Sequence, residues 1–78
     1  MGTVKIVTGE DPRAYMRIAD ALRRDIADGK LRPGSPTPSI TTLSQEHGVA
    51  RQTAAKALRL LEVEGLVRRV PGLGCYVR

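Results

Sequence analysis

The chain has 78 residues, enough for one small domain, and its formal net charge is +5. It holds one cysteine and one histidine, which excludes an internal disulfide and argues against a metal site. No apolar run approaches the roughly 20 residues that span a bilayer, and the N-terminus lacks the apolar stretch of a signal peptide. We therefore expect a cytoplasmic domain without membrane contact, metal or cofactor.

The charged residues are unevenly distributed along the chain. Residues 1–29 contain five basic and five acidic side chains, whereas residues 50–78 contain six basic and two acidic ones. A one-sided basic surplus is typical of polyanion binders. Many small soluble proteins carry a similar net charge. Charge alone therefore does not decide whether this domain binds nucleic acid.

The first part of the chain predicts an arm and one helix. Residues 1–10 are an N-terminal arm or a short strand, because the stretch TVKIVT is rich in β-branched residues. A helix follows, with Asp11 as its cap and Pro12 at its first helical position. Gly29 ends it, and the three prolines of residues 30–38 prevent its continuation. The apolar stripe of this helix consists of Tyr15, Ile18, Ala19, Leu22 and Ile26.

Two more helices are expected around a glycine turn. Ser39 can cap a helix that runs from Ile40 to about His47, and Gly48 closes it. A third helix runs from Arg51 to Glu64 and begins with a polar face. This pattern is typical of a helix-turn-helix whose second helix enters a DNA groove. The buried stripe of the third helix consists of Ala54, Ala57, Leu58 and Leu61.

The C-terminal part predicts a β-hairpin. Residues 66–70 form one strand, residues 71–74 the turn and residues 75–78 the returning strand. Three helices followed by a hairpin are the order of a winged helix-turn-helix. The fold class is therefore mainly α with a small β-hairpin wing, and residues 11–78 form this domain.

The ordered set of these residues resembles the N-terminal DNA-binding domain of GntR-type bacterial transcription regulators. The resemblance covers almost the whole chain. It implies a sequence-specific, double-stranded DNA-binding regulator, a repressor by family analogy, and not an enzyme. The matching residues include Tyr15, Ile18, Gly29, Pro33-Gly34, Pro38-Ser39, Leu43, Gly48-Val49-Ala50-Arg51-Gln52-Thr53, Ala57-Leu58, Glu64-Gly65-Leu66 and Gly72-Leu73-Gly74.

The resemblance implies DNA contacts from the starts of the second and third helices and from the Gly-x-Gly tip of the wing. An Arg at the start of the third helix can bind guanine through two hydrogen bonds. Lys56 and Arg59, on an adjoining face of that helix, are expected to reach phosphates. The candidate DNA-binding residues are Ser39, Thr41, Arg51, Gln52, Thr53, Lys56, Arg59, Gly72, Leu73 and Gly74; no catalytic or metal-binding residue is predicted.

The chain departs from the family pattern at three contact positions. Thr41 and Ala55 stand where the family usually has Arg, and Leu73 stands where a basic wing-tip residue is usual. The operator sequence therefore cannot be carried over from the family. These departures leave most of the expected recognition to residues 51–53.

Two other functions stay open at the level of sequence: a winged-helix protein-interaction module, and a nonspecific DNA-binding or plasmid-maintenance factor. Family members generally carry a C-terminal domain that binds an effector and dimerises. The expectation here is a regulator without an effector-binding domain, and without a small-molecule ligand, in this chain. Because one module makes few contacts, a homodimer on a two-fold operator is expected.

Overall fold

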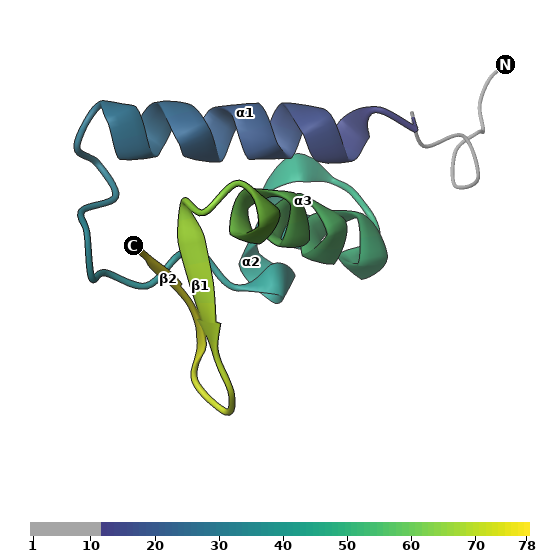
Figure 1. Cartoon of the computed structure of the whole chain (residues 1–78). Coiled ribbons are helices and arrows are strands. Elements are labelled where there is room, and N and C mark those ends of the chain that lie inside the picture. The colour runs from purple at the N-terminus through teal and green to yellow at the C-terminus, as the bar shows by residue number, and fades with distance from the viewer. Residues whose placement is uncertain (1–11) are drawn as a thin grey trace, which may run out of the picture.

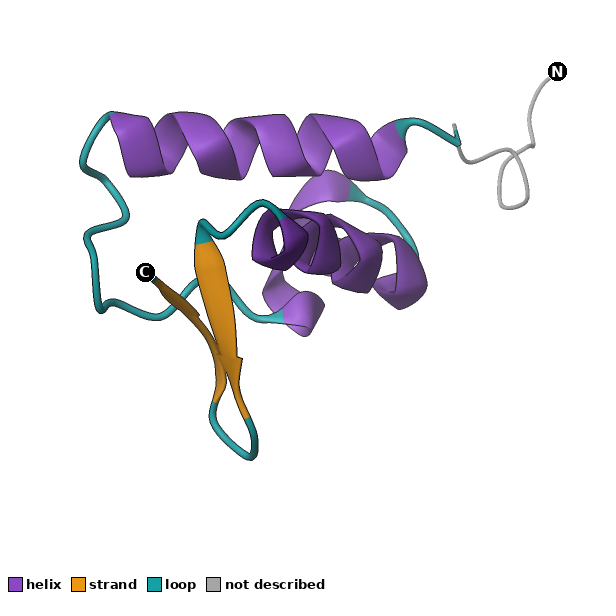
Figure 2. Ribbon diagram, in the orientation of Figure 1, coloured by secondary structure: helices purple, strands orange, loops and turns teal. Residues whose placement is uncertain are grey.

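The computed structural model describes residues 12–78, which fold into three helices and a two-stranded antiparallel hairpin (Figure 1; Figure 2). This architecture confirms the winged helix-turn-helix predicted from the sequence. The predicted arm or strand over residues 1–10 and the predicted cap Asp11 lie outside the described residues. The elements are α1 (Ala14–Ala27), α2 (Ile40–His47), α3 (Arg51–Val63), β1 (Val67–Val70) and β2 (Gly74–Val77).

The start of α1 differs from the prediction, which was wrong about Pro12. Pro12 lies in a turn before the helix, and Arg13 occupies the N-cap position. The Arg13 carbonyl accepts the backbone N–H groups of Met16 and Arg17, at 3.0 and 3.3 Å. Because this carbonyl begins the helical hydrogen-bond pattern, Ala14 is the first helical residue. Within the described part of the chain, no side chain caps this end.

The other boundaries agree with the prediction to within one or two residues. Gly29 and Gly48 follow α1 and α2 with φ of 83° and 65°, left-handed values that glycine adopts without strain. In the hairpin, the Leu73 N–H donates to the Val70 carbonyl at 2.9 Å. That bond closes the turn one residue earlier than expected, so Gly74 already belongs to β2. Over residues 12–78, no helix is both long and apolar enough to cross a membrane.

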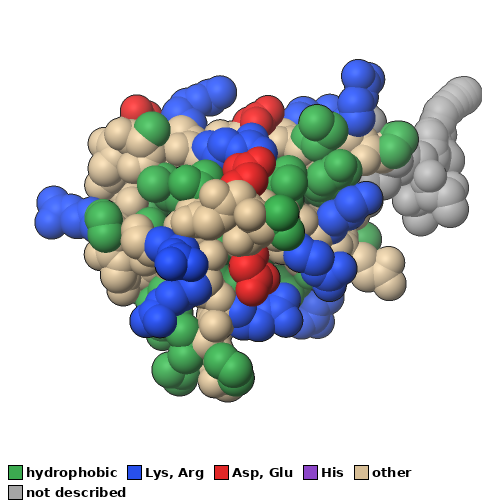
Figure 3. Space-filling model, in the orientation of Figure 1, with side chains coloured by type: hydrophobic (Ala, Val, Ile, Leu, Met, Phe, Trp, Pro, Cys, Tyr) green, Lys and Arg blue, Asp and Glu red, His purple; other side chains and the backbone are tan. Residues whose placement is uncertain are grey.

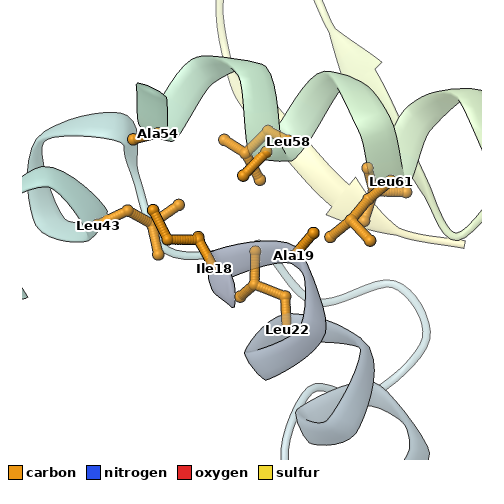
Figure 4. Packing of buried hydrophobic residues seen from close by; sticks show 9 residues of the cluster. Ile18, Ala19, Leu22, Leu43, Ala54, Leu58 and Leu61 are labelled. Carbon is orange, nitrogen blue, oxygen red and sulfur yellow. The ribbon is translucent and has the colours of Figure 1, made fainter. Parts of the chain in front are cut away.

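The hydrophobic core lies where α1, α2, α3 and β1 meet. In Figure 4, Ile18 of α1 points toward Leu43 of α2, which lies at one end of the cluster, and Ala19 of α1 points toward Leu61 of α3. The predicted stripe of α3 is buried in full, which confirms its helical spacing. The buried cluster consists of Ile18, Ala19, Leu22, Leu43, Ala54, Ala57, Leu58, Leu61 and Val67.

Two contacts outside the core also join α1 to α3. The Lys56 ammonium lies 4.2 Å from the centre of the Tyr15 ring, a cation–π contact. The Arg23 guanidinium pairs with the Glu64 carboxylate through two hydrogen bonds of 2.8 and 2.6 Å, and it also contacts Asp20. In both contacts the partner from α3 or its C-cap follows the α1 residue by 41 positions. The two helices therefore run side by side in the same direction.

The proline-rich loop between α1 and α2 pairs with the free edge of β2, which sequence analysis did not predict. Pro36 stands opposite Tyr76 in an isolated antiparallel bridge. Because its two neighbours make the ladder bonds, the missing N–H of Pro36 is not needed. Three backbone hydrogen bonds of 2.8, 2.9 and 2.9 Å join the segments: Gly34 N–H to Val77 C=O, Val77 N–H to Ser35 C=O, and Thr37 N–H to Cys75 C=O.

Replacing Leu61 with Ala is expected to lower the free energy of unfolding by about 2–5 kcal/mol, because it leaves a cavity between helices. Leu61 is fully buried, at 0% exposure. Urea unfolding followed by circular dichroism measures the loss. Leu73→Ala is the control at a position with 71% exposure, where a change below about 0.5 kcal/mol is expected. Equal losses in the two variants would contradict this core.

The ion pair with Arg23 predicts an acid-dependent contribution to stability. The hydrogen bonds between Arg23 and Glu64 hold the pKa of the Glu64 carboxyl below its ordinary value of 4.5 and raise the pKa of Arg23. A carboxyl whose pKa falls on folding stabilises the fold above its unfolded pKa, and this stabilisation is lost as the pH drops through its folded pKa.

The Glu64→Gln variant is therefore expected to unfold more easily than the wild type at pH 7, with the gap shrinking below about pH 4.5. Thermal unfolding between pH 3 and 7 measures this gap. Glu62→Gln removes the same charge from a carboxylate without an ion pair among the described residues, and it should leave the profile unchanged. A gap that persists at pH 3 would argue against the ion pair as its source.

Candidate nucleic-acid interface

The start of α2 is fixed by the predicted Ser39 cap. The Ser39 Oγ accepts the backbone N–H of Thr42 at 3.0 Å, and the hydroxyl oxygens of these two residues also lie 3.0 Å apart. This cap sets the direction of the first helical turn. It leaves Thr41 exposed at the surface while Leu43 enters the core.

The turn after α2 places the next helix. Gly48 takes a left-handed conformation and its backbone N–H bonds back to the Ser44 carbonyl. The Ser44 hydroxyl donates to the Val49 carbonyl at 2.6 Å, and the half-buried Val49 side chain packs against the core. These bonds tie the turn to α2 at Ser44, and the packing of Val49 ties it to the core. As a result, α3 begins at the surface with Arg51, close to the start of α2.

Arg51 extends from the first position of α3 and is exposed. Its Nη2 donates to the Thr41 Oγ1 at 3.2 Å, so the starts of the two helices are joined at the surface. Gln52 is also exposed, while Thr53 is half-buried. The polar start of α3 thus places the Arg51 guanidinium beside the Thr41 hydroxyl of α2.

A groove separates the hairpin wing from the helices. Its walls are residues 36–41, residues 69–75, and Ala55 and Leu58 of α3. The wing projects from the body on the side away from α1 (Figure 1). Figure 3 shows Lys and Arg side chains on both sides of the base of the wing and hydrophobic side chains at its tip.

The wing tip is shaped by its glycines. Gly72 and Gly74 have φ of 81° and 116°, which an L side chain rarely adopts. These conformations turn the chain sharply and leave Leu73 exposed at the tip. The tip can therefore approach a ligand closely with backbone and with one apolar side chain.

The structure places the ten candidate residues in two groups. Around the groove lie Ser39, Thr41, Gly72, Leu73 and Gly74. The other five are on α3, where Arg51 adjoins the first group through Thr41 and Arg59 is exposed. Lys56 is turned toward Tyr15 of α1. A phosphate contact from Lys56, which stays a prediction, would have to share or break this cation–π contact.

One cationic residue of the groove, Arg69, was not among the residues predicted for the site. Arg68 and Arg69 are neighbours on β1, so their side chains lie on opposite faces of the hairpin. In the antiparallel register, Arg68 pairs with Tyr76 and Arg69 with Cys75, and it is Arg69 that lines the groove. The missing signal was the strand register, which fixes the face on which each residue lies.

The second helix of the helix-turn-helix begins with an exposed arginine, and a β-hairpin wing lies beside it across a groove. These features are typical of the winged helix-turn-helix DNA-binding domains of transcription regulators. The sequence matches the family described as bacterial regulatory proteins, gntR family, over residues 14–77. The chain belongs to this family, and it is a DNA-binding domain of the transcription-regulator type.

Two relatives and one solved structure illustrate the similarity. The mannosyl-D-glycerate transport/metabolism system repressor MngR of Escherichia coli is 41% identical, with 82% of this chain and 27% of MngR covered. The transcriptional repressor NagR of Bacillus subtilis is 36% identical, with 81% and 26% covered. The AraR DNA-binding domain in complex with operator ORX1 has a TM-score of 0.81 and 28% identity, with 100% and 93% covered. This chain spans about a quarter of the length of MngR and NagR.

Replacing Gly48 with Ala is expected to destabilise the domain by about 1–2 kcal/mol, because a Cβ is disfavoured in the left-handed region. No atom lies within 4 Å of the added carbon, so the cost arises from the backbone and not from a clash. Chemical denaturation measures the cost. Gln45→Ala, at an exposed position of α2, should change stability by less than about 0.5 kcal/mol. A Gly48→Ala variant as stable as the control would show that the turn tolerates a side chain.

Proposed function

We propose that this chain is the operator-binding domain of a bacterial transcription repressor and that it recognises a specific sequence in double-stranded DNA. The repressor role is supported by MngR and NagR, which are both named repressors. Because its target is bacterial DNA, the proposed location is the cytoplasm.

The observation that carries this proposal is the exposed start of α3. Arg51 stands at the helix end that reaches base edges in this motif, and Gln52 follows it at the surface. The AraR domain, which matches this chain over its full length, is solved in complex with an operator. In our proposal α3 enters the major groove and Arg51 binds a guanine.

The wing completes the proposed interface. Its exposed tip, formed by residues 72–74, extends toward the minor groove while α3 occupies the major groove. Arg69 and the other cations at the base of the wing attract the phosphates between the grooves. The basic surplus of residues 50–78 lies in the elements that this orientation brings to the DNA.

The small size of the interface favours two copies on one operator. A single winged helix offers one recognition helix and one wing. Two copies related by a two-fold axis would double these contacts on half-sites about one helical turn, or a multiple of it, apart. We therefore propose that the operator is an inverted repeat bound by a pair of these domains.

Selection from random DNA duplexes tests the proposal and is expected to yield one enriched sequence. Arg51→Ala should then weaken binding to that sequence by about tenfold or more, because a bidentate Arg–guanine pair is worth about 1–3 kcal/mol of discrimination. Binding to a scrambled duplex should fall much less. Fluorescence anisotropy with both duplexes measures the two affinities.

Arg24→Ala is the matched control, because Arg24 is exposed and belongs to α1, the helix that lies on the side of the body away from the wing (Figure 1). It should leave the preference for the selected sequence unchanged.

Raising the salt concentration fourfold should weaken binding by about a hundredfold if about four phosphates are contacted. An unselective pool with a steep salt dependence would identify a nonspecific DNA-binding factor instead. No duplex binding at low salt would identify a protein-interaction module.

A further inference from the structure

The starts of α2 and α3 are linked by one side-chain hydrogen bond, from the Arg51 Nη2 to the Thr41 Oγ1 at 3.2 Å. Both side chains are exposed, so burial does not force them together. We propose that Thr41 is a positioning residue, which orients the Arg51 guanidinium for base recognition. This inference rests on the proposed function of the domain.

The Arg51 guanidinium has few alternative anchors. Within residues 12–78, the ion pairs are those of Arg23, and no carboxylate pairs with Arg51. The N-terminus of a helix carries partial positive charge, which disfavours a cation there. Arg51 lies at the start of α3, and its partner Thr41 lies at the start of α2. The neutral Thr41 hydroxyl is therefore the acceptor that holds the cation in this place.

Thr41 is itself firmly placed. The Ser39 cap fixes the first turn of α2 on one side of it, and the buried Leu43 anchors the helix to the core on the other. One turn after Arg51 on the same side of α3 lies Ala55, which offers only a methyl group. The acceptor for Arg51 thus comes from α2, not from its own helix.

The hydrogen bond leaves the guanidinium able to bind DNA. Arginine has five N–H donors, and Thr41 takes one of them. Two parallel donors remain for the O6 and N7 atoms of a guanine. Because the side chain is already oriented in the free protein, less conformational freedom is lost on binding. Thr41 in this role changes affinity through Arg51, without touching a base itself.

A double-mutant cycle on the selected operator tests this inference. Thr41→Val removes the acceptor while keeping the side-chain shape, and it should weaken operator binding by about fivefold with little effect on a scrambled duplex. Thr41→Ser keeps the hydroxyl and should stay within about twofold of the wild type. In the Arg51→Ala background, Thr41→Val should have no further effect beyond about twofold.

Two measurements without DNA separate positioning from a structural role. The thermal unfolding midpoint of Thr41→Val should match that of the wild type, because both partners are exposed. Nitrogen-15 NMR should show slowed rotation of the Arg51 guanidinium in the wild type and in Thr41→Ser, and faster rotation in Thr41→Val. Equally fast rotation in all three proteins would overturn the inference.

The cycle also has outcomes that overturn it. If Thr41→Val weakens binding equally with and without Arg51, Thr41 contacts DNA by itself and does not act through Arg51. If Thr41→Val binds the operator as well as the wild type, the hydrogen bond has no role in recognition. If selection yields no enriched sequence, the proposed function fails, and this inference fails with it. An enriched sequence with no coupling between the two residues rejects the positioning role alone.

Discussion

The apolar side of α3 packs against α1, α2 and β1. Ala54, Ala57, Leu58 and Leu61 of α3 pack in one cluster with side chains of α1, α2 and β1. Removing this surface from water stabilises all four elements at once, by about 25 cal/mol for each Å² of apolar area buried. The two alanines allow close packing against their neighbours. Because these residues occupy one side of α3, its polar residues must lie on the other sides.

This arrangement determines which cations are available at the surface. On the α1 side, Lys56 contacts Tyr15, and the Arg23–Glu64 pair lies two helical turns further on. On the side of α2 and the wing, no carboxylate from the described residues pairs with Arg51. Among the described residues, opposite charges are thus paired at the α1–α3 contact, by Arg23 and Glu64, while Arg51 and Arg69 beside the groove form no ion pair. Such an asymmetry is the electrostatic form expected of a surface that meets phosphates.

The sequence predicted much of the fold and part of the site, and the differences have physical causes. Helical spacing identified the buried stripe of α3, and the Ser39 cap and Gly48 turn were read from residue types with strong local preferences. Pro12 was placed wrongly because proline fits either a first helical turn or a preceding turn. The groove-lining Arg69 could not be chosen over its neighbour without the strand register.

The sequence by itself determined the three helices, the hairpin, the positions of the turns and the chemical character of the start of α3. These depend on periodicity, capping and glycine conformation, which act over a few residues. Only the tertiary structure decided that the proline-rich loop pairs with β2, that Lys56 faces α1 and that Thr41 holds Arg51. These contacts join residues far apart in the chain. Their geometry is set by how α1, α2 and β1 pack on the buried side of α3, and no local pattern records that packing.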